Sequence, residues 1–390
     1  MHILIIPSTY PTYEFPLSSI FYKEQALAVK EYGNKVGVIF SETRRISKIS
    51  YSTIKRNHFQ VSNYNEEGVS TYRLHGWNVF TMRGMLGVNL WVRQSIKLFE
   101  KYINEQGKPD IIHVHSALYG GLVAVEIRKK YNIPFVITEH SSSILQGGLR
   151  YHDIPILQKV YKNADYIISV GGALKNSIQK YCDKNVEVIP NIVDINRFSI
   201  GSHNKNSEEF TFISVCNLKE SKNVRLTIEA FKEILRVNKN IRLIIVGDGP
   251  EKMNLIKLSR SIKHKIDFVG AVSREKLNEY INKADAFVLP SKFETFGIAY
   301  IEALACGIPI IATKCGGPED FFNEKIGYMI PIDNLCELIT AMINIIENNN
   351  KFNRSYIREY AERRFSNKVV SEKIINVYNK VLNGNGDIDE

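Results

Sequence analysis

The stretch ADAFVLPSKFETFGIAYIEALACGIPIIAT, residues 284–313, contains two strand-like runs on either side of a helix-like run. ADAFVLP and IPIIAT are short and rich in aliphatic residues, as buried strands are, whereas IAYIEALA favours a helix that stops at Gly307. A strand, a helix and a second strand in this order are typical of a parallel strand pair joined by a crossover helix. The stretch therefore predicts a parallel sheet covered by helices.

The same alternation runs through both halves of the chain. Before residue 200 the strand-like runs are ILIIP, KVGVIF, VSTYRL, DIIHVHS, PFVITEH, DYIISV and VEVIP, with helical periodicity between several of them. In the second half they are FTFISVCN, RLIIVGDGP, IDFVGAV, ADAFVLPS, IPIIAT and GYMIP. We predict an α/β fold of two Rossmann-like, doubly wound parallel-sheet domains. Because such sheets bind ligands at the carboxyl ends of their strands, we expect a ligand in a cleft between the domains.

A polar segment, SIGSHNKNSEE, separates the two halves and is the natural linker, so we place the boundary near Gly201. The N-terminal domain is predicted to span residues 1–200 and the C-terminal domain residues 201–365. Residues 366–390 belong to a long polar helical pattern, which we expect to pack back on the N-terminal domain.

The composition, with 44% apolar and 24% charged residues among 390, is ordinary for a soluble globular protein of two or three domains. The N-terminal MHILIIPSTYP has a short apolar run and no basic leader, so it predicts a first strand rather than a signal peptide. No apolar run approaches the roughly 18 residues of a membrane-spanning helix. The five cysteines are scattered without metal-binding spacing, and we expect buried thiols in a cytoplasmic protein.

The positive charge is concentrated in the N-terminal half. Residues 1–190 carry 23 lysines and arginines against 15 acids, a net of +8, whereas the rest of the chain carries 28 against 26. One stretch, residues 43–65, has no acid and holds Arg44, Arg45, Lys48, Lys55 and Arg56. Such a run most often forms a solvated, mobile loop, but a basic patch also attracts anionic lipid or nucleic acid.

Two glutamates, Glu294 and Glu302, flank Gly297 within the apolar run. Gly297 begins the predicted helix just beyond a strand end, and the unpaired N–H groups there favour an anion such as a diphosphate. Carboxylates close to that anion would be repelled by it, so we expect them to accept hydrogen bonds from the hydroxyl groups of a ribose or a sugar ring. This spacing predicts a site that binds sugar, phosphate and ribose in order.

The sequence also resembles a known family over nearly its whole length. ETFGIAYIEALACGIPIIAT is similar to the E-x7-E element of the retaining GT-B glycosyltransferases usually called family 4. The resemblance extends to NVEVIPNIVDINRF, VCNLKESKNVRLTIEAF, LIIVGDGPE, FVGAV and ADAFVLPSKFETFG, in this order. Together they imply a GT-B fold, in which the two domains face each other across a cleft.

The resemblance assigns roles to side chains in both domains. It implies that Glu302 binds the ribose hydroxyls of a nucleotide-sugar and that Glu294 contacts the hydroxyls of the transferred sugar. Lys222, in LKESK, matches the family's lysine on the donor diphosphate. His140, in TEHSS, matches a histidine that the family places beside the reacting sugar; its alternative is a structural histidine at the end of a buried strand.

Main-chain contacts to the donor follow from the same resemblance. The backbone of Phe296, Gly297 and Ile298 is expected to bind the diphosphate, and the main chain from Gly270 to Val272 is expected to lie near the base. The donor contacts are completed by two further residues of the quoted motifs, Asn217 and Gly249.

The sequence departs from the family pattern at two places. Asn217 stands where an arginine usually lies five residues before the lysine, so one cation at the diphosphate is missing or comes from elsewhere. Ser18 and Ser19 replace the glycine pair common after the first strand, which weakens the expected phosphate contact there.

No metal and no cofactor are expected. His113 and His115 alternate on one strand and share a face as a metal pair would, but no third ligand is evident, so we interpret them as structural or cleft-lining. The only D-x-D match, residues 387–389, lies in the C-terminal tail. The helix N-terminus and Lys222 are therefore expected to stabilise the leaving group without a metal ion.

The function implied is metal-independent, retaining transfer of a sugar from a nucleotide-diphosphate sugar, with a UDP-sugar favoured, to a hydroxyl of an acceptor. The opening STYPTYEFPLSSIFYKEQALAV looks like members that build bacterial surface polysaccharide, whose acceptors are glycans or lipid-linked glycans at the cytoplasmic face of the membrane. Peripheral attachment to that face through the basic N-terminal half is a hypothesis. The alternatives are a nucleotide-sugar 2-epimerase of the same fold and a nucleic-acid binding protein, although the basic stretch has few aromatic residues for stacking. The sequence leaves open the base, the sugar, the acceptor linkage and the oligomeric state.

Overall fold

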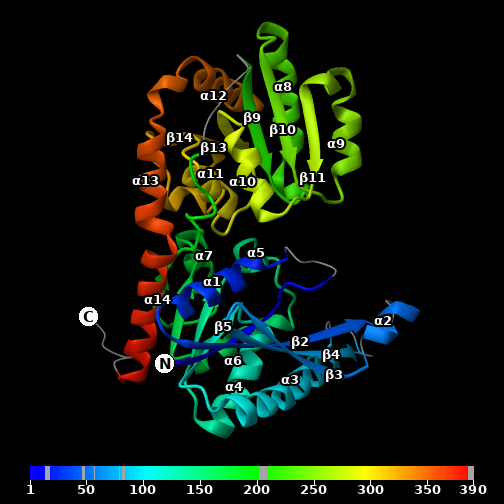
Figure 1. Ribbon diagram of the computed structural model, residues 1–390, viewed down its shortest axis with the longest axis vertical. Helices are drawn as coiled ribbons and strands as arrows, with labels where there is room; N and C mark the ends of the chain where they lie inside the picture. The colour runs from blue at the N-terminus through cyan, green and yellow to red at the C-terminus, as the bar shows by residue number, and fades with distance from the viewer. Residues whose placement is uncertain are drawn as a thin grey trace. The chain divides into compact units, whose positions relative to one another are not determined.

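The chain forms two compact units in the computed structural model, which describes residues 1–13, 18–45, 49–56, 58–78, 80, 84–201 and 209–384, without the side chains of Arg45 and Arg56 (Figure 1). Unit 1 comprises Met1–Val170, Leu174–Pro190 and Val370–Glu390. Unit 2 comprises Gly171–Ala173 and Asn191–Val369.

Unit 1 is built on an eight-stranded sheet with the order β3-β4-β2-β1-β5-β6-β7-β8. The strands are β1 (His2–Pro7), β2 (Lys35–Arg45), β3 (Gln60–Glu66), β4 (Val69–Asn78), β5 (Ile111–His115), β6 (Phe135–Glu139), β7 (Tyr166–Ser169) and β8 (Val186–Val188). All pairs are parallel except β3–β4, which is antiparallel. Without β3, the order is that of a doubly wound sheet, and it reverses direction between β1 and β5.

Helices cover both faces of the unit 1 sheet (Figure 1). They are α1 (Ile20–Glu31), α2 (Tyr51–Arg56), α3 (Met85–Gln106), α4 (Gly120–Tyr131), α5 (Ser142–Leu145), α6 (Asp153–Asn163), α7 (Gly172–Ile178) and α14 (Asn367–Leu382). The helices α3, α4 and α6 pack together on one face. On the other face, Tyr22 of α1 stacks on His115 and Tyr378 of α14 contacts His113, because the two histidines of β5 project to the same side.

Unit 2 contains a six-stranded, fully parallel sheet with the order β11-β10-β9-β12-β13-β14. Its strands are β9 (Phe210–Val215), β10 (Ile241–Val246), β11 (Ile266–Gly270), β12 (Ala286–Leu289), β13 (Ile310–Thr313) and β14 (Gly327–Ile330). The order reverses between β9 and β12, which places the switch point of this doubly wound sheet there. The parallel pairing in both sheets agrees with strand runs such as IIHVH and FTFISV, in which every residue is buried.

The helices of unit 2 complete its layers. They are α8 (Val224–Val237), α9 (Lys252–Leu258), α10 (Arg274–Asn282), α11 (Ile298–Ala305), α12 (Leu335–Glu347) and α13 (Arg354–Phe365). Short 3₁₀ turns are η2 (Glu220–Lys222), η3 (Arg260–Lys265), η4 (Pro318–Asp320) and η5 (Asn349–Lys351). The helix α8 packs on α12, and α11 packs on α13, so that both faces of the sheet are covered.

The predicted strands are confirmed, since every strand-like run quoted from the sequence overlaps one of the observed strands. The interpretation of residues 43–65 as a solvated loop is wrong for most of the described part. That part contains the end of β2, the helix α2 and the strand β3, which pairs with β4 from Gln60 to Glu66. The polar composition of β3 hid it, because an edge strand needs no apolar face. Lys48 and the D-x-D match at residues 387–389 lie outside the described residues.

Candidate functional site

Two loops of unit 2 carry most of the residues expected at the donor site. One follows β9 and includes Asn217 and Lys222, and the other follows β12 and includes Glu294 and Gly297. The strands β9 and β12 are parallel neighbours, and the sheet order reverses between them. The loops that follow their carboxyl ends therefore lie side by side at the same edge of the sheet. The fold therefore brings together residues that are about 70 positions apart in the chain.

Glu294 and Lys222 form a direct ion pair in these loops. The Lys222 Nζ donates to Glu294 Oε1 at 2.7 Å, and the Ser291 hydroxyl donates to the same oxygen at 2.8 Å. Glu294 is 8% exposed, and its carbonyl oxygen accepts a hydrogen bond from Gly317 N–H at 2.8 Å. Burial opposes the charge of Lys222, but the Glu294 carboxylate outweighs this effect and raises the pKa of the lysine. Lys222 is therefore charged at neutral pH, and the backbone around Glu294 fixes the contact.

Gly297 forms the turn from the β12 loop into α11. Its φ of +96° lies in the left-handed region, and a Cβ at this position would come within 2.6 Å of the Tyr300 ring. The Phe296 ring packs against Phe321 and Phe365, with centroids 5.9 and 5.6 Å away, so its side chain belongs to the core. Phe296 therefore offers only its main chain to a ligand, as expected at the start of a helix. Ile298, the first residue of α11, is half-buried.

Glu302 lies on α11 and is 2% exposed. Its carboxylate is held by an ion pair with Arg274, the first residue of α10, whose guanidinium lies 4.9 Å from the centre of the Phe198 ring. Sequence reasoning did not select Arg274, and no local motif marks it, because the contact spans 28 positions between two helices. The carboxylate predicted to bind ribose is thus already oriented by a cation.

The remaining predicted donor contacts lie in neighbouring loops at the same edge of the sheet. Gly270 ends β11 with a φ of +82°, and its carbonyl oxygen accepts from Gly247 N–H at 2.8 Å. A Cβ on Gly249 would approach Asn217 Oδ1 to 2.7 Å, so the loops after β9 and β10 are in close contact. Val272 follows Gly270 and is half-buried. The structure gives these residues a shared location, while their contacts to a donor remain a prediction.

His140 follows β6 in unit 1 and lies in an aromatic cluster. Its Nε2 is 3.1 Å from His115 Nδ1, and its ring is 5.1 Å from Phe21 and 4.9 Å from Tyr22, centre to centre. Burial lowers the pKa of His140 to about 3 and that of His115 well below its usual value, with neighbouring histidines adding to both effects. Both rings are therefore neutral at physiological pH.

His113 uses both of its ring nitrogens within unit 1. Its Nδ1 is 2.6 Å from the Tyr378 hydroxyl, and its Nε2 is 2.7 Å from Thr138 Oγ1. Within the described ranges, no three histidine, cysteine or carboxylate side chains are grouped as metal ligands. These contacts support the structural interpretation of His113.

Glu139 is a further functional candidate that sequence reasoning missed. It is fully buried, and its carboxylate accepts hydrogen bonds from the backbone N–H groups of Ala117, His140 and Ser141 and from the Tyr161 hydroxyl, at 2.9 to 3.1 Å. Burial raises the pKa of this carboxyl, although the backbone donors counteract part of the effect. Glu139 ties the loop after β5 to the loop after β6 and so fixes the backbone of His140.

The serine pair, Ser18 and Ser19, lies directly before α1. Ser19 has a φ of +54° and precedes α1, and its Oγ is 2.7 Å from Thr9 Oγ1. The preceding residues 14–17 lie outside the described part, so the expected phosphate contact of this loop remains a prediction.

A polar pocket of about 690 Å³ lies at the carboxyl ends of β1, β2 and β4 in unit 1. Glu42 and Glu66 line it together with Arg44, Arg73 and His75. Arg44 Nη2 is 3.2 Å from a Glu42 oxygen, and Arg73 Nη2 is 3.3 Å from a Glu66 oxygen. This pocket, formed partly by the unpredicted strand β3, offers paired charges and hydroxyl groups that suit a polyhydroxylated ligand.

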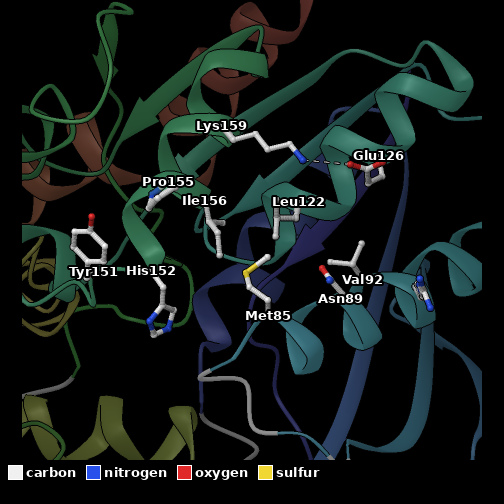
Figure 2. A pocket seen from close by; sticks show the side chains of 11 residues that line it. Met85, Asn89, Val92, Leu122, Glu126, Tyr151, His152, Pro155, Ile156 and Lys159 are labelled. Atoms are coloured by element: carbon white, nitrogen blue, oxygen red, sulfur yellow. Dashed lines mark ion pairs between the residues drawn. The ribbon is translucent and has the colours of Figure 1, made fainter.

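A second pocket of similar volume lies among α3, α4 and α6, and Figure 2 shows its lining. Met85, Val92, Leu122 and Ile156 form apolar walls, while Lys159 pairs with Glu126 at 3.5 Å. Large apolar side chains are exposed at this end of the helical layer: Leu86 is 66% exposed and Tyr151 is 91% exposed.

None of the described helices is long and apolar enough to cross a membrane.

Comparison with known proteins decides the family. Residues 31–197 match the family model described as Glycosyltransferase Family 4, and residues 196–364 match the one described as Glycosyl transferases group 1. The chain belongs to the family 4, group 1 glycosyltransferases. The expected α/β fold with two parallel-sheet domains is thereby confirmed, because the structural neighbours of this glycosyltransferase have the GT-B fold.

Three relatives illustrate the range of the family. The glycosyltransferase is 27% identical over 318 residues to the alpha-monoglucosyldiacylglycerol synthase of Acholeplasma laidlawii, covering 73% of this chain and 77% of that one. It is 24% identical over 344 residues to the putative teichuronic acid biosynthesis glycosyltransferase TuaC of Bacillus subtilis, covering 83% and 84%. The solved structure of Anabaena HepE in complex with UDP and glucose superposes with a TM-score of 0.72 at 17% identity, covering 97% and 99%. These relatives give no support to the 2-epimerase alternative.

Proposed function

We propose that this glycosyltransferase moves a sugar, with retention of configuration, from a nucleotide-diphosphate sugar to a hydroxyl of a glycan or lipid-linked glycan acceptor in the biosynthesis of a cell-surface polysaccharide. The observation that carries the proposal is the Lys222–Glu294 pair beside the start of α11, at the switch point of unit 2. A cation and a sugar-binding carboxylate stand there next to the unpaired N–H groups of a helix. A UDP-sugar is favoured as donor, in keeping with the UDP found in the Anabaena structure.

The diphosphate leaving group is bound by Lys222 and by the main chain of Phe296, Gly297 and Ile298. As the bond to the sugar breaks, negative charge develops on the phosphate oxygen, and fixed donors at this position stabilise it. Because Lys222 is already held at 2.7 Å from Glu294, little reorganisation is needed when the donor binds. These residues supply the electrostatic stabilisation for a reaction that requires no metal ion.

The two carboxylates position the sugar and the ribose. Glu294 accepts hydrogen bonds from hydroxyls of the transferred sugar, and Glu302, oriented by Arg274, accepts them from the ribose. Neither carboxylate is assigned as the nucleophile, since both have fixed partners within unit 2. The acceptor hydroxyl attacks from the same face as the departing phosphate, whose oxygen takes the proton of the acceptor.

The acceptor is assigned to unit 1. The polar pocket of Glu42, Glu66, Arg44, Arg73 and His75 lies at the carboxyl edge of the sheet, where ligands of such sheets bind. Its volume of about 690 Å³ is within the usual range for small-ligand sites. We assign this pocket to the sugar portion of the acceptor.

Peripheral attachment to the inner face of the cell membrane is the second part of the proposal. The exposed Met85 and Tyr151 line the apolar pocket of Figure 2 together with the cations Arg93 and Lys159. Leu86, which follows Met85 on α3, is exposed as well. Apolar side chains beside cations favour contact with an anionic lipid surface. In flotation with anionic liposomes at low salt, we expect the wild-type protein to float and a Leu86→Asp variant to float much less. A wild-type protein that remains at the bottom of the gradient would refute the attachment.

The proposed donor site is tested by ligand binding. UDP-, GDP- and ADP-sugars are added to the wild-type protein and to Glu302→Ala, and binding is followed by thermal shift and saturation-transfer NMR. We expect one donor to bind the wild type and to lose most of its affinity for the variant. The matched control is Glu279→Ala, which removes an exposed glutamate from α10 and is expected to bind like the wild type. Equal binding to Glu302→Ala and the wild type would refute the assigned role.

A further inference from the structure

The loop after β13, residues 315–317, lies against the loop after β12 that carries Glu294. We propose that Glu319 is a positioning residue, which holds the loop 315–317 in place and thereby fixes the main chain of Glu294 and Phe296. The structural part is carried by contacts within unit 2 alone, and the effect on sugar transfer rests on the proposed function.

The main chain of Glu294 is bound by this loop on both sides. Glu294 and Gly316 form a single parallel bridge beyond the ends of β12 and β13. The Glu294 N–H donates to the Cys315 carbonyl oxygen at 3.2 Å, and Gly317 N–H donates to the Glu294 carbonyl oxygen at 2.8 Å. Both backbone polar groups of Glu294 are thus satisfied by residues 315–317, so the loop determines where the Glu294 side chain begins.

The same loop packs directly on the main chain of Phe296. A Cβ on Gly317 would lie 2.4 Å from the Phe296 carbonyl oxygen and 2.5 Å from the Phe296 Cα. These are backbone atoms, which cannot rotate away as a flexible side chain would, so the close approach requires a glycine. Because the main chain of Phe296 is proposed to bind the diphosphate, the loop contacts two separate parts of the donor site.

Glu319 holds the loop through two backbone hydrogen bonds. Its Oε2 accepts the N–H of Cys315 at 3.1 Å and the N–H of Gly316 at 2.8 Å. Glu319 lies in the 3₁₀ turn η4, which begins at Pro318, and Gly316 has a φ of +117° in the left-handed region. Hydrogen bonds from backbone N–H groups to a carboxylate are stronger than those to a neutral oxygen. The Glu319 carboxylate therefore stabilises the conformation in which the loop meets Glu294.

The exposure of Glu319 separates its role from that of a core residue. Glu319 is exposed, whereas Glu294 is 8% and Phe296 is 2% exposed. Removal of an exposed side chain opens no cavity, so a variant at this position is expected to fold. The Glu294 carboxylate would keep Lys222 and Ser291 as partners, but its backbone would lose support. A displacement of about 1 Å at a reacting group can slow an enzyme about 100-fold, so a smaller shift already has a measurable effect.

The first experiment follows the two loops in the free protein. The full-length wild type, Glu319→Ala and Glu319→Gln are compared by hydrogen exchange and mass spectrometry. The glutamine oxygen can still accept both N–H groups, whereas alanine cannot. We expect the segments 290–297 and 314–318 to exchange several-fold faster in Glu319→Ala and close to the wild-type rate in Glu319→Gln. Unchanged exchange of both segments in Glu319→Ala would overturn the proposal, whatever the outcome of the activity assays.

The second experiment separates positioning from general stability by kinetics. We expect Glu319→Ala to lower kcat about tenfold, with a donor KM within about twofold of the wild-type value, and Glu319→Gln to restore most of kcat. The matched control is Glu324→Ala, which removes another exposed glutamate of the same segment and is expected to behave like the wild type. Circular dichroism verifies that all variants fold.

Two kinetic outcomes would overturn the positioning role. One is a wild-type kcat in Glu319→Ala, and the other is a kcat in Glu319→Gln that is as low as in Glu319→Ala. A wild-type protein that binds no nucleotide-sugar would refute the proposed function instead, while the exchange measurement would still decide whether Glu319 holds the two loops.

Discussion

The two units place different chemistry at the same position in similar sheets. In unit 2, the loops beyond β9 and β12 hold a charged pair, Lys222 and Glu294. In unit 1, the ends of β5 and β6 hold neutral histidines and a buried carboxyl, Glu139. The difference teaches that the doubly wound fold provides a location, while the local partners decide whether a buried group is charged.

The same comparison explains how each site avoids the cost of burial. The opposite charges of Lys222 and Glu294 offset each other's cost of burial, and the Ser291 hydroxyl donates a further hydrogen bond to Glu294. His115 and His140 avoid charge altogether and share a hydrogen bond. An ion pair suits the binding of a diphosphate, whereas neutral donors suit a sugar.

The largest effect is expected from removing the charge in unit 2. Glu294→Gln keeps the size of the side chain but removes the carboxylate, which leaves Lys222 unpaired and the sugar with a weaker acceptor. We expect transfer to fall about 100-fold or more in kcat/KM. The measurement is initial-rate product formation from the donor identified by binding, with circular dichroism to verify the fold. Turnover near the wild-type level would show that the Glu294 carboxylate has no role in sugar transfer.

The second prediction compares how acidic pH changes the stability of the two units. Because the pKa values of His113 and His140 lie near 3 in the folded state, the unfolded chain binds more protons below about pH 6.5, and the free energy of unfolding falls as the pH drops. The loss is about 1.4 kcal/mol for each such histidine at pH 5.5. The raised pKa of Lys222 has no effect in this range, since the contribution of a raised lysine is lost only at alkaline pH.

Hydrogen exchange measured at pH 7.5 and pH 5.5, corrected for the intrinsic exchange rates, resolves the units within one sample. We expect protection of β5 and β6 to fall more than protection of β9 and β12. The raised pKa of Glu139 acts in the opposite direction, because protonation of this carboxyl is easier in the folded chain, and so reduces the loss in unit 1. Equal losses in both sheets would contradict the neutral histidine cluster.

A smaller effect is expected from the second ion pair of unit 2. Arg274→Gln leaves the Glu302 carboxylate buried without its cation, which favours the protonated form and weakens its hydrogen bonds from ribose. We expect KM for the donor to rise roughly tenfold, with little change in kcat. Arg225→Gln, which removes an exposed partner of Glu229, serves as the control and is expected to behave like the wild type. Identical donor KM values for the two variants would leave Arg274 without a role in binding.

The smallest effect is expected in unit 1. Tyr378→Phe removes the hydrogen bond between α14 and His113 but retains the aromatic packing. We expect a loss of about 1 kcal/mol in the free energy of unfolding, measured in urea, and no change in the donor KM. An unchanged urea midpoint would mean that the contact contributes nothing, and a changed KM would connect α14 to donor binding.

Local sequence patterns determined most of the strands, the parallel sheets and the position of the loops that carry Lys222 and Glu294. ADAFVLP, IAYIEALA and IPIIAT are each long enough to specify their own secondary structure, and Gly297 marks the helix start through its backbone freedom. The family resemblance selected Glu294, Lys222 and His140 by motif, but their partners were not predictable from local patterns.

Only the tertiary structure decided which groups meet. Arg274 pairs with Glu302, which lies 28 positions further along the chain, and His115 contacts His140, 25 positions further along. The strand β3 joins the sheet through its pairing with β4. None of these contacts follows from a local period, because each depends on how separate helices and strands pack. The charge of Lys222 and the neutrality of His140 depend in turn on those contacts, since burial and neighbouring groups set a pKa only after the chain has folded.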